Sequence, residues 1–340
     1  MKVAAFTGEI NDPSSRYRVR QYIDILKEYD IDIDDFISLN GKYPPVEKNK
    51  RLLWGAKTLA ERFKQVVNVK LKNYDCIILQ REMISTLNTF EKLTPRPRIL
   101  DVDDAVYLYR RGNFIKKIAK SSDVVICGNE HLADVFEKWN NNIYIIPTAV
   151  DTRKYVPNVT AKRKKEKVTI GWIGTSGGFE YLYKIEKALN YILNMNKNSE
   201  LLIVSDSEPK FSLIDNFRYI KWNEKSEVDN FQKIDIGLMP LIDDDWSRAK
   251  CSYKMLLHMS CETPVVVSPV GMNQEVLQRG NIGFGAVDYY SDWIESLEYL
   301  IDNEVKRSEM GKCARQVIEN NYSLEILSKK MSEIIIKTVR

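Results

Sequence analysis

Residues 161–175 read AKRKKEKVTIGWIGT, and this stretch decides how the rest of the chain is divided. Its first half is strongly basic and lacks apolar periodicity, which indicates a solvated linker. Its second half is an apolar run that ends in glycine and threonine, as a buried strand does before a turn into a helix. We therefore expect a second domain to begin at this point of the chain.

Short apolar runs alternate with helical segments on both sides of this linker. Helices are expected at about 18–29, 181–193 and 251–260. The runs read KVAAFTG, IDIDDFISL, DCIILQ, RILDVDD, DVVICGN and IYIIPTA before the linker, and KVTIGWIGT, ELLIVSD, FRYIKW, IDIGLMP and TPVVVSPVG after it. Strands that alternate with helices predict a parallel sheet covered on both faces, so the fold class is α/β with two facing, doubly wound domains.

The expected domains are residues 1–156 and residues 157–321. An amphipathic helix at about 323–339 lies in the closing segment, 322–340, which we expect to pack back on the first domain. Parallel sheets bind ligands at the carboxyl ends of their strands. The expected rim of the site is formed by the loops Thr7-Gly8, Gly128-Asn129, Gly174-Thr175 and Pro269-Gly271.

Composition excludes several classes of protein. With 44% apolar and 29% charged residues, the chain has the composition of an ordinary globular protein, and a formal net charge of +4 gives no reason to expect nucleic acid as a partner. Five scattered cysteines and two histidines give no disulfide framework and no metal site. The amino terminus lacks the pattern of a secretory signal, so we expect a cytoplasmic protein.

Two features after the linker favour an anionic ligand. Gly174 and Thr175 lie between a strand and a helix in a glycine-rich turn, where the backbone can approach a phosphate; the alternative is a turn required only by the geometry of the chain. Arg248, Lys250 and Lys254 surround a predicted helix start, and Lys250 and Lys254 are one turn apart. They predict a diphosphate site, unless they are solvated cations balanced by the acids at 243–245.

At this point the sequence resembles a known family. The segment WSRAKCSYKMLLHMSCETPVVVSPVGMNQEV, at 246–276, is similar to the donor-binding region of family-four glycosyltransferases, which have the GT-B fold of two Rossmann-like domains. The first half of the chain adds SSRYRVRQY, YDCIILQRE, ILDVDDAVY, SSDVVICGNEHLADVF and IYIIPTAVDTRKY in the order that this family carries them.

The resemblance implies an activity. It implies transfer of a sugar from a nucleotide-diphosphate sugar to a glycan or lipid-linked glycan acceptor, with retention at the anomeric carbon and with neither a metal nor a cofactor. A nucleotide-sugar epimerase remains an alternative, as does a non-catalytic carbohydrate-binding protein of two domains.

The resemblance also implies roles for individual residues. Asn273 and Glu275 join the donor site, although Glu275 could instead be an acid that serves only the start of a helix. The acceptor side takes Arg16, Arg18 and Arg81, although Arg81 could instead pair with Glu82.

The catalytic centre takes Asp103, Asp104 and His131. Asp101 and Asp103 could otherwise be strand-end turn residues and helix caps. Asp101, Asp103 and Asp104 could also form the metal-binding motif of the GT-A fold, and His131 could be structural. The two glutamates that the family often carries eight positions apart appear here as Ala249 and Leu257, and Glu262 replaces a glycine, so no residue is predicted to hold the ribose.

A basic segment at 48–72 suggests a membrane surface as a further partner. It carries eight lysines or arginines. At helical spacing an apolar stripe leaves Trp54 on the opposite face with lysines, which suits a headgroup layer. The stripe consists of Leu52, Ala56, Leu59, Phe63 and Val66, and the lysines are Lys50, Lys57 and Lys64. The alternative is a solvated basic helix on an ordinary domain.

Overall fold

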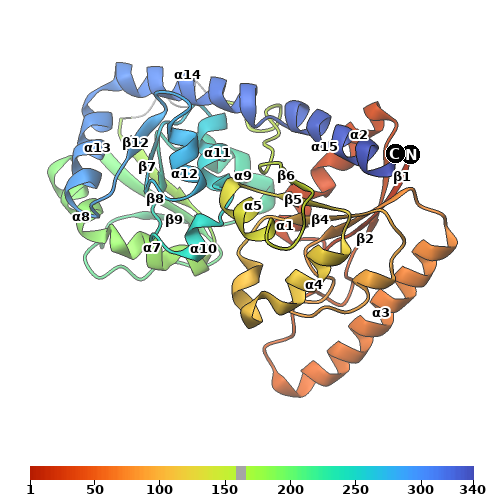
Figure 1. Cartoon of the computed structure of the whole chain (residues 1–340). Helices are drawn as coiled ribbons and strands as arrows, with labels where there is room; N and C mark the ends of the chain where they lie inside the picture. Colours follow the sequence, from red (N-terminus) through yellow and green to blue (C-terminus); the bar gives the residue numbers. More distant parts are fainter. Residues whose placement is uncertain (158–165) are drawn as a thin grey trace. The chain divides into compact units, whose positions relative to one another are not determined.

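The computed structural model describes residues 1–157 and 166–340. The predicted basic linker at 161–167 lies outside the described residues except for its last two. Contacts divide the chain into two units (Figure 1). Unit 1 comprises Met1–Ala149, Ala249–Cys251 and Leu324–Arg340, and unit 2 comprises Val150–Arg248 and Ser252–Ser323.

Unit 1 is built on a six-stranded sheet in the order β2-β1-β3-β4-β5-β6, in which every pair of neighbours is parallel. The strands are β1 (Lys2–Phe6), β2 (Asp32–Phe36), β3 (Cys76–Gln80), β4 (Arg98–Val102), β5 (Val124–Cys127) and β6 (Ile143–Ile145). β2 lies on one side of β1 and β3 on the other, so the strand order reverses at β1.

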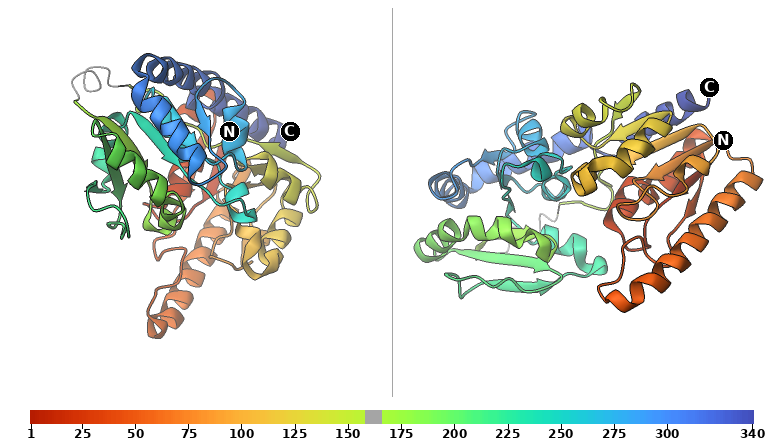
Figure 2. Two further views of the ribbon diagram at one scale, coloured as in Figure 1. Left: turned by 90° about the vertical axis from the view of Figure 1, so that its left-hand side faces the viewer. Right: turned by 60° about the horizontal axis from the view of Figure 1, so that its bottom comes forward.

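Helices flank this sheet, as the two views of Figure 2 show. They are α1 (Pro13–Arg18), η1 (Arg20–Tyr22), α2 (Ile23–Leu26), η2 (Lys27–Tyr29), η3 (Lys48–Lys50), α3 (Arg51–Leu71), η4 (Glu91–Leu93), η5 (Val106–Gly112), α4 (Asn113–Ser121), α5 (Glu130–Phe136) and α15 (Leu324–Val339). The helix predicted at about 18–29 appears as η1, α2 and η2, which follow one another from Arg20 to Tyr29, and Val19 (φ −127°, ψ −59°) separates them from α1. From α15, Leu327 and Ile335 enter the core beside Val3.

Unit 2 repeats the design with a second six-stranded parallel sheet, in the order β12-β11-β10-β7-β8-β9. Its strands are β7 (Val168–Ile173), β8 (Ser199–Ser205), β9 (Arg218–Lys221), β10 (Ile236–Met239), β11 (Val265–Val267) and β12 (Gly283–Gly285). The order reverses at β7, between β8 and β10. The predicted pair of doubly wound parallel sheets is therefore confirmed, with β12 as an additional edge strand.

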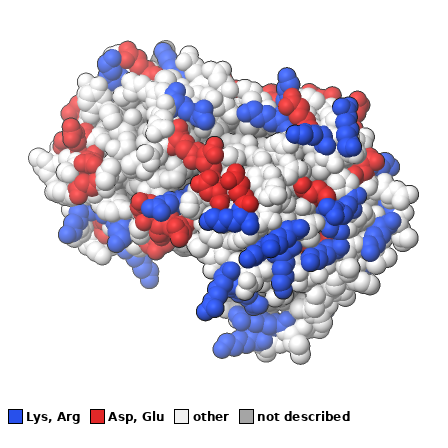
Figure 3. Space-filling view, viewed as in Figure 1, with Lys and Arg blue, Asp and Glu red and all other residues white. Residues whose placement is uncertain are grey.

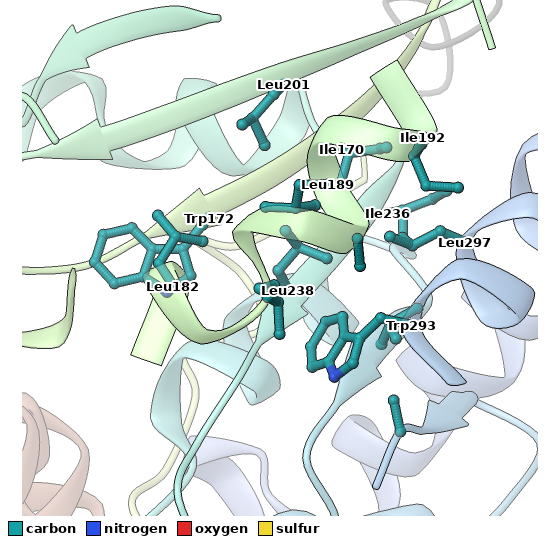
Figure 4. Packing of buried hydrophobic residues seen from close by; sticks show 14 of the residues in the cluster. Ile170, Trp172, Leu182, Leu189, Ile192, Leu201, Ile236, Leu238, Trp293 and Leu297 are labelled. Carbon is teal, nitrogen blue, oxygen red and sulfur yellow. The ribbon is translucent and has the colours of Figure 1, made fainter. Parts of the chain in front are cut away.

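The helices of unit 2 enclose an apolar core. They are η6 (Ser176–Gly178), α7 (Phe179–Lys184), α8 (Glu186–Met195), η7 (Glu224–Ser226), α9 (Glu227–Gln232), α10 (Asp245–Arg248), α11 (Tyr253–Ser260), α12 (Met272–Leu277), α13 (Ser291–Asp302) and α14 (Glu304–Asn321). Figure 4 shows Leu189 of α8 and Trp293 of α13 packed with Leu238 of β10. The helix predicted at 181–193 is broken at Ile185, which separates α7 from α8.

Candidate functional site

The reversal of strand order locates the candidate site in each unit. In a doubly wound sheet, the connections on the two sides of the reversal leave in opposite directions and open a crevice at the carboxyl ends of the strands. In unit 1 this edge lies where β1, β3 and β4 end. In unit 2 it lies where β7 and β10 end.

In unit 2, Lys254 of α11 lies over the turn that follows β7. Its Nζ is 4.9 Å from the centre of the Trp172 ring, a cation–π distance. A Cβ on Gly174 would stand 2.4 Å from the same Nζ and 2.7 Å from the Trp172 ring. Only glycine fits here, so the turn brings bare backbone close to an ammonium group.

The rest of the turn is held in place by an acid on the neighbouring strand's loop. Asp206 accepts two hydrogen bonds from Ser176, one from its backbone N–H at 2.6 Å and one from its hydroxyl at 2.8 Å. Thr175 is exposed at the rim. Gly171 differs from Gly174, because a Cβ there would meet Ile234 at 2.3 Å, so its small size serves packing within the unit.

The other predicted cations have different surroundings. Arg248 ends α10, is half-exposed and donates from Nε to Asp243 Oδ1 at 2.7 Å, so it has an acidic partner as the alternative interpretation expected. Lys250 precedes α11, which begins only at Tyr253 because Ser252 has left-handed backbone (φ 49°). The prediction that Lys250 and Lys254 share one helix face is therefore wrong.

By its contacts Lys250 belongs to unit 1, where its carbonyl accepts a hydrogen bond from Asn129 Nδ2 at 3.0 Å. The two predicted residues of α12 lie in unit 2. Asn273 is fully buried and donates from Nδ2 to the Ser268 carbonyl at 3.0 Å, so it ties α12 to the end of β11. Glu275 lies in the first turn of the same helix and is partly exposed.

In unit 1, a network of charges lies at the ends of β3 and β4. Arg81 donates from Nε to Asp103 Oδ1 at 2.6 Å and lies 3.9 Å from Asp104 Oδ2. The Ser14 hydroxyl donates to Asp103 and accepts from Arg81. The structure thus brings the two predicted catalytic acids together with one predicted acceptor residue.

The two acids differ in electrostatics. Burial disfavours the charged form of Asp103, but the charge and hydrogen bond of Arg81 outweigh it and lower the pKa to about 2. For Asp104 burial dominates, and it raises the pKa of that carboxyl above its ordinary value despite the nearby Arg81. Asp103 is therefore ionised at neutral pH and held in place by Arg81, whereas Asp104 ionises less readily than Asp103.

The alternative of an Arg81–Glu82 ion pair is wrong. Arg81 has left-handed backbone (φ 59°), which turns its side chain toward Asp103. Glu82 instead faces Lys42, whose Nζ lies 3.8 Å from Glu82 Oε1 in almost complete burial.

The remaining predicted residues of unit 1 lie apart from this network. Arg18 is 2% exposed, and its guanidinium donates to Asp101 at 2.6 Å and to the Ile146 carbonyl at 2.7 Å. Arg16 is partly exposed, with its guanidinium carbon 5.1 Å from the centre of the Tyr17 ring. Arg18 therefore already holds the interior of the unit together, and an acceptor contact for either arginine stays a prediction.

His131 lies in the first turn of α5. Its Nε2 is 2.9 Å from the Tyr107 hydroxyl, so the ring is oriented by a neighbour. Asn129 caps this helix by accepting from the Leu132 N–H at 2.9 Å. The histidine is partly exposed, and its predicted contact with the donor sugar stays a prediction.

Comparison with known proteins gives the fold a name. No protein-family model and no curated protein sequence matches the chain. Solved structures do. Sucrose-phosphate synthase from Thermosynechococcus elongatus has a TM-score of 0.73 at 14% identity, over 99% of this chain and 98% of that one. The chain has the GT-B fold.

Two further GT-B structures cover almost the whole chain. WaaG, a glycosyltransferase involved in lipopolysaccharide biosynthesis, has a TM-score of 0.70 at 12% identity, over 98% of this chain and 99% of that one. HepE of Anabaena, solved with UDP and glucose, has a TM-score of 0.68 at 12% identity, over 98% of each chain. At these identities the likeness is one of fold.

Sequence reasoning missed several residues beside the candidate sites of the two units. Trp172, Asp206, Ser14 and Lys42 all contact predicted site residues or their neighbours. Trp172 lies two positions before Gly174, and an aromatic residue at the end of a strand could have been noted as a platform for a cation. Asp206 lies 30 residues from its partner, and nothing local to it gives a signal.

Proposed function

We propose that this chain is a glycosyltransferase, with unit 2 binding a nucleoside-diphosphate sugar and unit 1 binding the acceptor. One observation carries the proposal. The ammonium group of Lys254 lies over the bare backbone of Gly174, at the carboxyl end of β7, where a GT-B fold binds its ligand. A cation beside a glycine turn at a strand end suits a diphosphate.

In this reaction the protein must stabilise the negative charge that develops on the leaving diphosphate. The acceptor's hydroxyl oxygen bonds to the anomeric carbon and gives its proton to the departing diphosphate or to solvent. The bond from that carbon to the diphosphate breaks, and negative charge grows on the departing oxygen. Lys254 and the N–H groups of the turn would stabilise that charge with neither a metal nor a cofactor. We further propose that Glu275 binds the donor and that the buried Asn273 supports it by holding α12 to the end of β11. Asp103, Asp104 and His131 would face the reacting sugar, and the anomeric configuration would be retained.

A thermal-shift panel tests the nucleotide part of the proposal. HepE was solved with UDP and with UDP-glucose, so these are the first ligands to try. A ligand that binds the native state alone stabilises it by RT ln(1 + L/Kd), where L is the free ligand concentration, so the melting temperature rises with the logarithm of that concentration once it exceeds the dissociation constant. We expect at least one nucleoside diphosphate to do so in the wild type and less in Lys254→Ala. A panel without any stabilising nucleotide contradicts the proposal.

Incubation with the donor alone separates the alternatives. An epimerase would convert the sugar without an acceptor, a carbohydrate-binding protein would leave both donor and acceptor unchanged, and a transferase needs both. We expect turnover only when a glycan acceptor is added.

Helix α3 supports a lipid-linked acceptor. The predicted apolar stripe does not enter the core: Leu52 is 86% exposed, Phe63 is 51% exposed, and only Val66 of the stripe is buried. Trp54 is partly buried and donates its indole N–H to the Asn40 carbonyl at 2.9 Å, so the interpretation of Trp54 as the headgroup residue is wrong.

The buried face of α3 comprises Thr58, Arg62, Val66 and Val69. Exposed leucines and a phenylalanine among lysines suit the surface of an anionic membrane. Among the described residues, no helix is both long and apolar enough to cross a bilayer. We propose that α3 lies on such a surface and brings unit 1 to a lipid-linked glycan.

A further inference from the structure

The last three residues of η5, directly before α4, hold left-handed backbone. They are Arg110 (φ 47°), Arg111 (φ 55°) and Gly112 (φ 68°). Glycine accepts this geometry freely, but a side chain with a Cβ raises its free energy. Two successive arginines in this region are unusual. Strained backbone of this kind persists where the surrounding structure enforces it, and it is concentrated at binding sites.

The surroundings of the loop account for how the strain is maintained. A Cβ on Gly112 would lie 2.8 Å from the Tyr107 carbonyl oxygen and 3.5 Å from the Trp139 ring, so the chain turns tightly there. The Asn113 N–H donates to the Arg110 carbonyl, and the Tyr107 hydroxyl is hydrogen-bonded to His131. The backbone is thus held, whereas the side chains of Arg110 and Arg111 are exposed.

The segment that carries these arginines is basic throughout. Residues 105–122 contain no aspartate or glutamate. Their five cations, all exposed, are Arg110, Arg111, Lys116, Lys117 and Lys120. Figure 3 shows blue side chains gathered over the part of unit 1 that carries η5 and α4. Within residues 1–157 and 166–340, neither arginine forms an ion pair.

We propose that Arg110 and Arg111 form a phosphate-binding site on unit 1. A guanidinium presents a planar fork of N–H donors that matches phosphate oxygens, and two adjacent forks suit one dianion. Binding of an anion would reduce the repulsion between the five cations. Its free energy would also compensate for the free-energy cost of the strained backbone. The basic segment 105–122 begins directly after Asp104, at the edge of the sheet that carries the acidic network, and Arg110 follows six positions after Asp104. If unit 1 binds the acceptor, that acceptor bears a phosphate. Only this last step rests on the proposed function.

Two double variants that each remove two positive charges test the site. Asparagine tolerates left-handed backbone, so Arg110→Asn/Arg111→Asn removes the charge without distorting the loop. Lys92→Asn/Lys138→Asn removes two exposed cations elsewhere in unit 1 and is the matched control. Inorganic phosphate is titrated by phosphorus NMR into both pairs in a Lys254→Ala background, so that binding at the donor turn does not contribute.

We expect the arginine pair to weaken phosphate binding about tenfold or more, and the control pair to leave it nearly unchanged. The melting temperature of the arginine variant should stay constant or rise, because strain is relieved while the fold is kept. A purely structural role for the arginines predicts a lower melting temperature with unchanged phosphate binding.

Vesicles distinguish the source of the phosphate. Sedimentation with phosphatidylcholine vesicles, with or without phosphatidic acid, is measured for the same variants. If the arginine variant binds both inorganic phosphate and phosphatidic acid more weakly, the site is a general phosphate site. If only binding to inorganic phosphate is weakened, the ligand is a soluble phosphate. If only binding to phosphatidic acid is weakened, the ligand is a lipid headgroup. Unchanged binding in both arms, no measurable binding by the wild type in either, or an equal loss in the control pair overturns the proposal. Nucleoside diphosphate affinity, measured separately with Lys254 intact, reports on the proposed function independently.

Discussion

The ammonium group of Lys254 lies 4.9 Å from the centre of the Trp172 ring and directly over Gly174. Stacking on the ring holds the cation above the backbone of the turn, where a phosphate can reach both. Because Trp172 is 3% exposed, this arrangement is supported from inside unit 2.

Replacing Lys254 by alanine should weaken binding of a nucleoside diphosphate about 10–150-fold. A hydrogen bond to a charged group contributes about 1.5–3 kcal/mol, and this contact would be lost. Calorimetric titration into wild type, Lys254→Ala and the exposed control Lys184→Ala measures the effect. Unchanged affinity in Lys254→Ala, with a lowered melting temperature, would mean that Lys254 serves only the packing of Trp172.

Gly174→Ala should abolish measurable diphosphate binding, while the protein still folds with a lowered melting temperature. The added methyl group would stand 2.4 Å from Lys254 Nζ and 2.7 Å from the buried Trp172 ring, so the lysine must leave the turn and the ring must shift. Gly177→Ala is the matched control, because its nearest neighbour would be the Thr175 hydroxyl at 3.9 Å. Titration of both variants with the same nucleotide, beside their melting curves, checks the difference. Equal affinities in the two variants would place the phosphate elsewhere.

Arg18→Met should destabilise the protein by about 3–5 kcal/mol, because it leaves the Asp101 carboxylate buried without its partner. The double variant Arg18→Met/Asp101→Leu should recover part of that loss, since both charges are gone. Arg16→Met, on a partly exposed side chain, should change the free energy of unfolding much less. Urea unfolding of the three variants measures these differences, and a double variant no more stable than Arg18→Met would argue against the pair.

Much of the fold could be predicted from the sequence, for a physical reason. Strands buried on both faces appear as continuous apolar runs, and KVTIGWIGT therefore marked β7 correctly. β12 could not be found in this way, because its three residues read GFG and pair only at the edge of the sheet. Helix breaks at Val19, Ile185 and Ser252 depend on backbone angles that tertiary packing selects, and periodicity does not report them.

The candidate site was predictable only where its chemistry is local. Gly174 and Asp103 follow strands, so their place at the sheet edge could be inferred. The partner of Arg81 could not: Glu82 is adjacent in sequence, but the left-handed backbone at Arg81 directs its side chain to Asp103, 22 residues away. Pairings of this kind depend on which strands become neighbours, and short-range patterns do not contain that information.

Acid should destabilise unit 1 through Asp103. Its pKa falls from 3.8 in the unfolded chain to about 2 in the fold, so its ionised form stabilises the protein fully above about pH 4, and this contribution is lost as the pH falls through 2. The free energy of unfolding, measured with urea from about pH 5 down to about pH 2, should fall less steeply in Asp103→Asn than in the wild type. Asp134→Asn, on the exposed side of α5, should keep the wild-type slope. Parallel slopes in all three proteins would contradict the role assigned to Asp103.

Membrane binding should depend on the exposed face of α3. Each lysine near an anionic surface contributes about 1 kcal/mol, so Lys57→Gln/Lys64→Gln should weaken binding to phosphatidylglycerol vesicles about 30-fold, and added salt should shrink the difference. Leu52→Ser/Phe63→Ser should weaken binding at every salt concentration, because insertion of apolar side chains is not screened.

The matched control for the apolar pair is Val287→Ser/Val305→Ser, since these valines of unit 2 are 72% and 70% exposed. None of these substitutions lies in a core, so melting temperatures should stay close to that of the wild type, and a loss of flotation then reports the surface itself. Equal flotation of the α3 variants and the valine control would show that the exposed stripe does not meet a membrane. It would also remove the main argument for a lipid-linked acceptor, because the charge of α3 alone is equally compatible with a solvated helix.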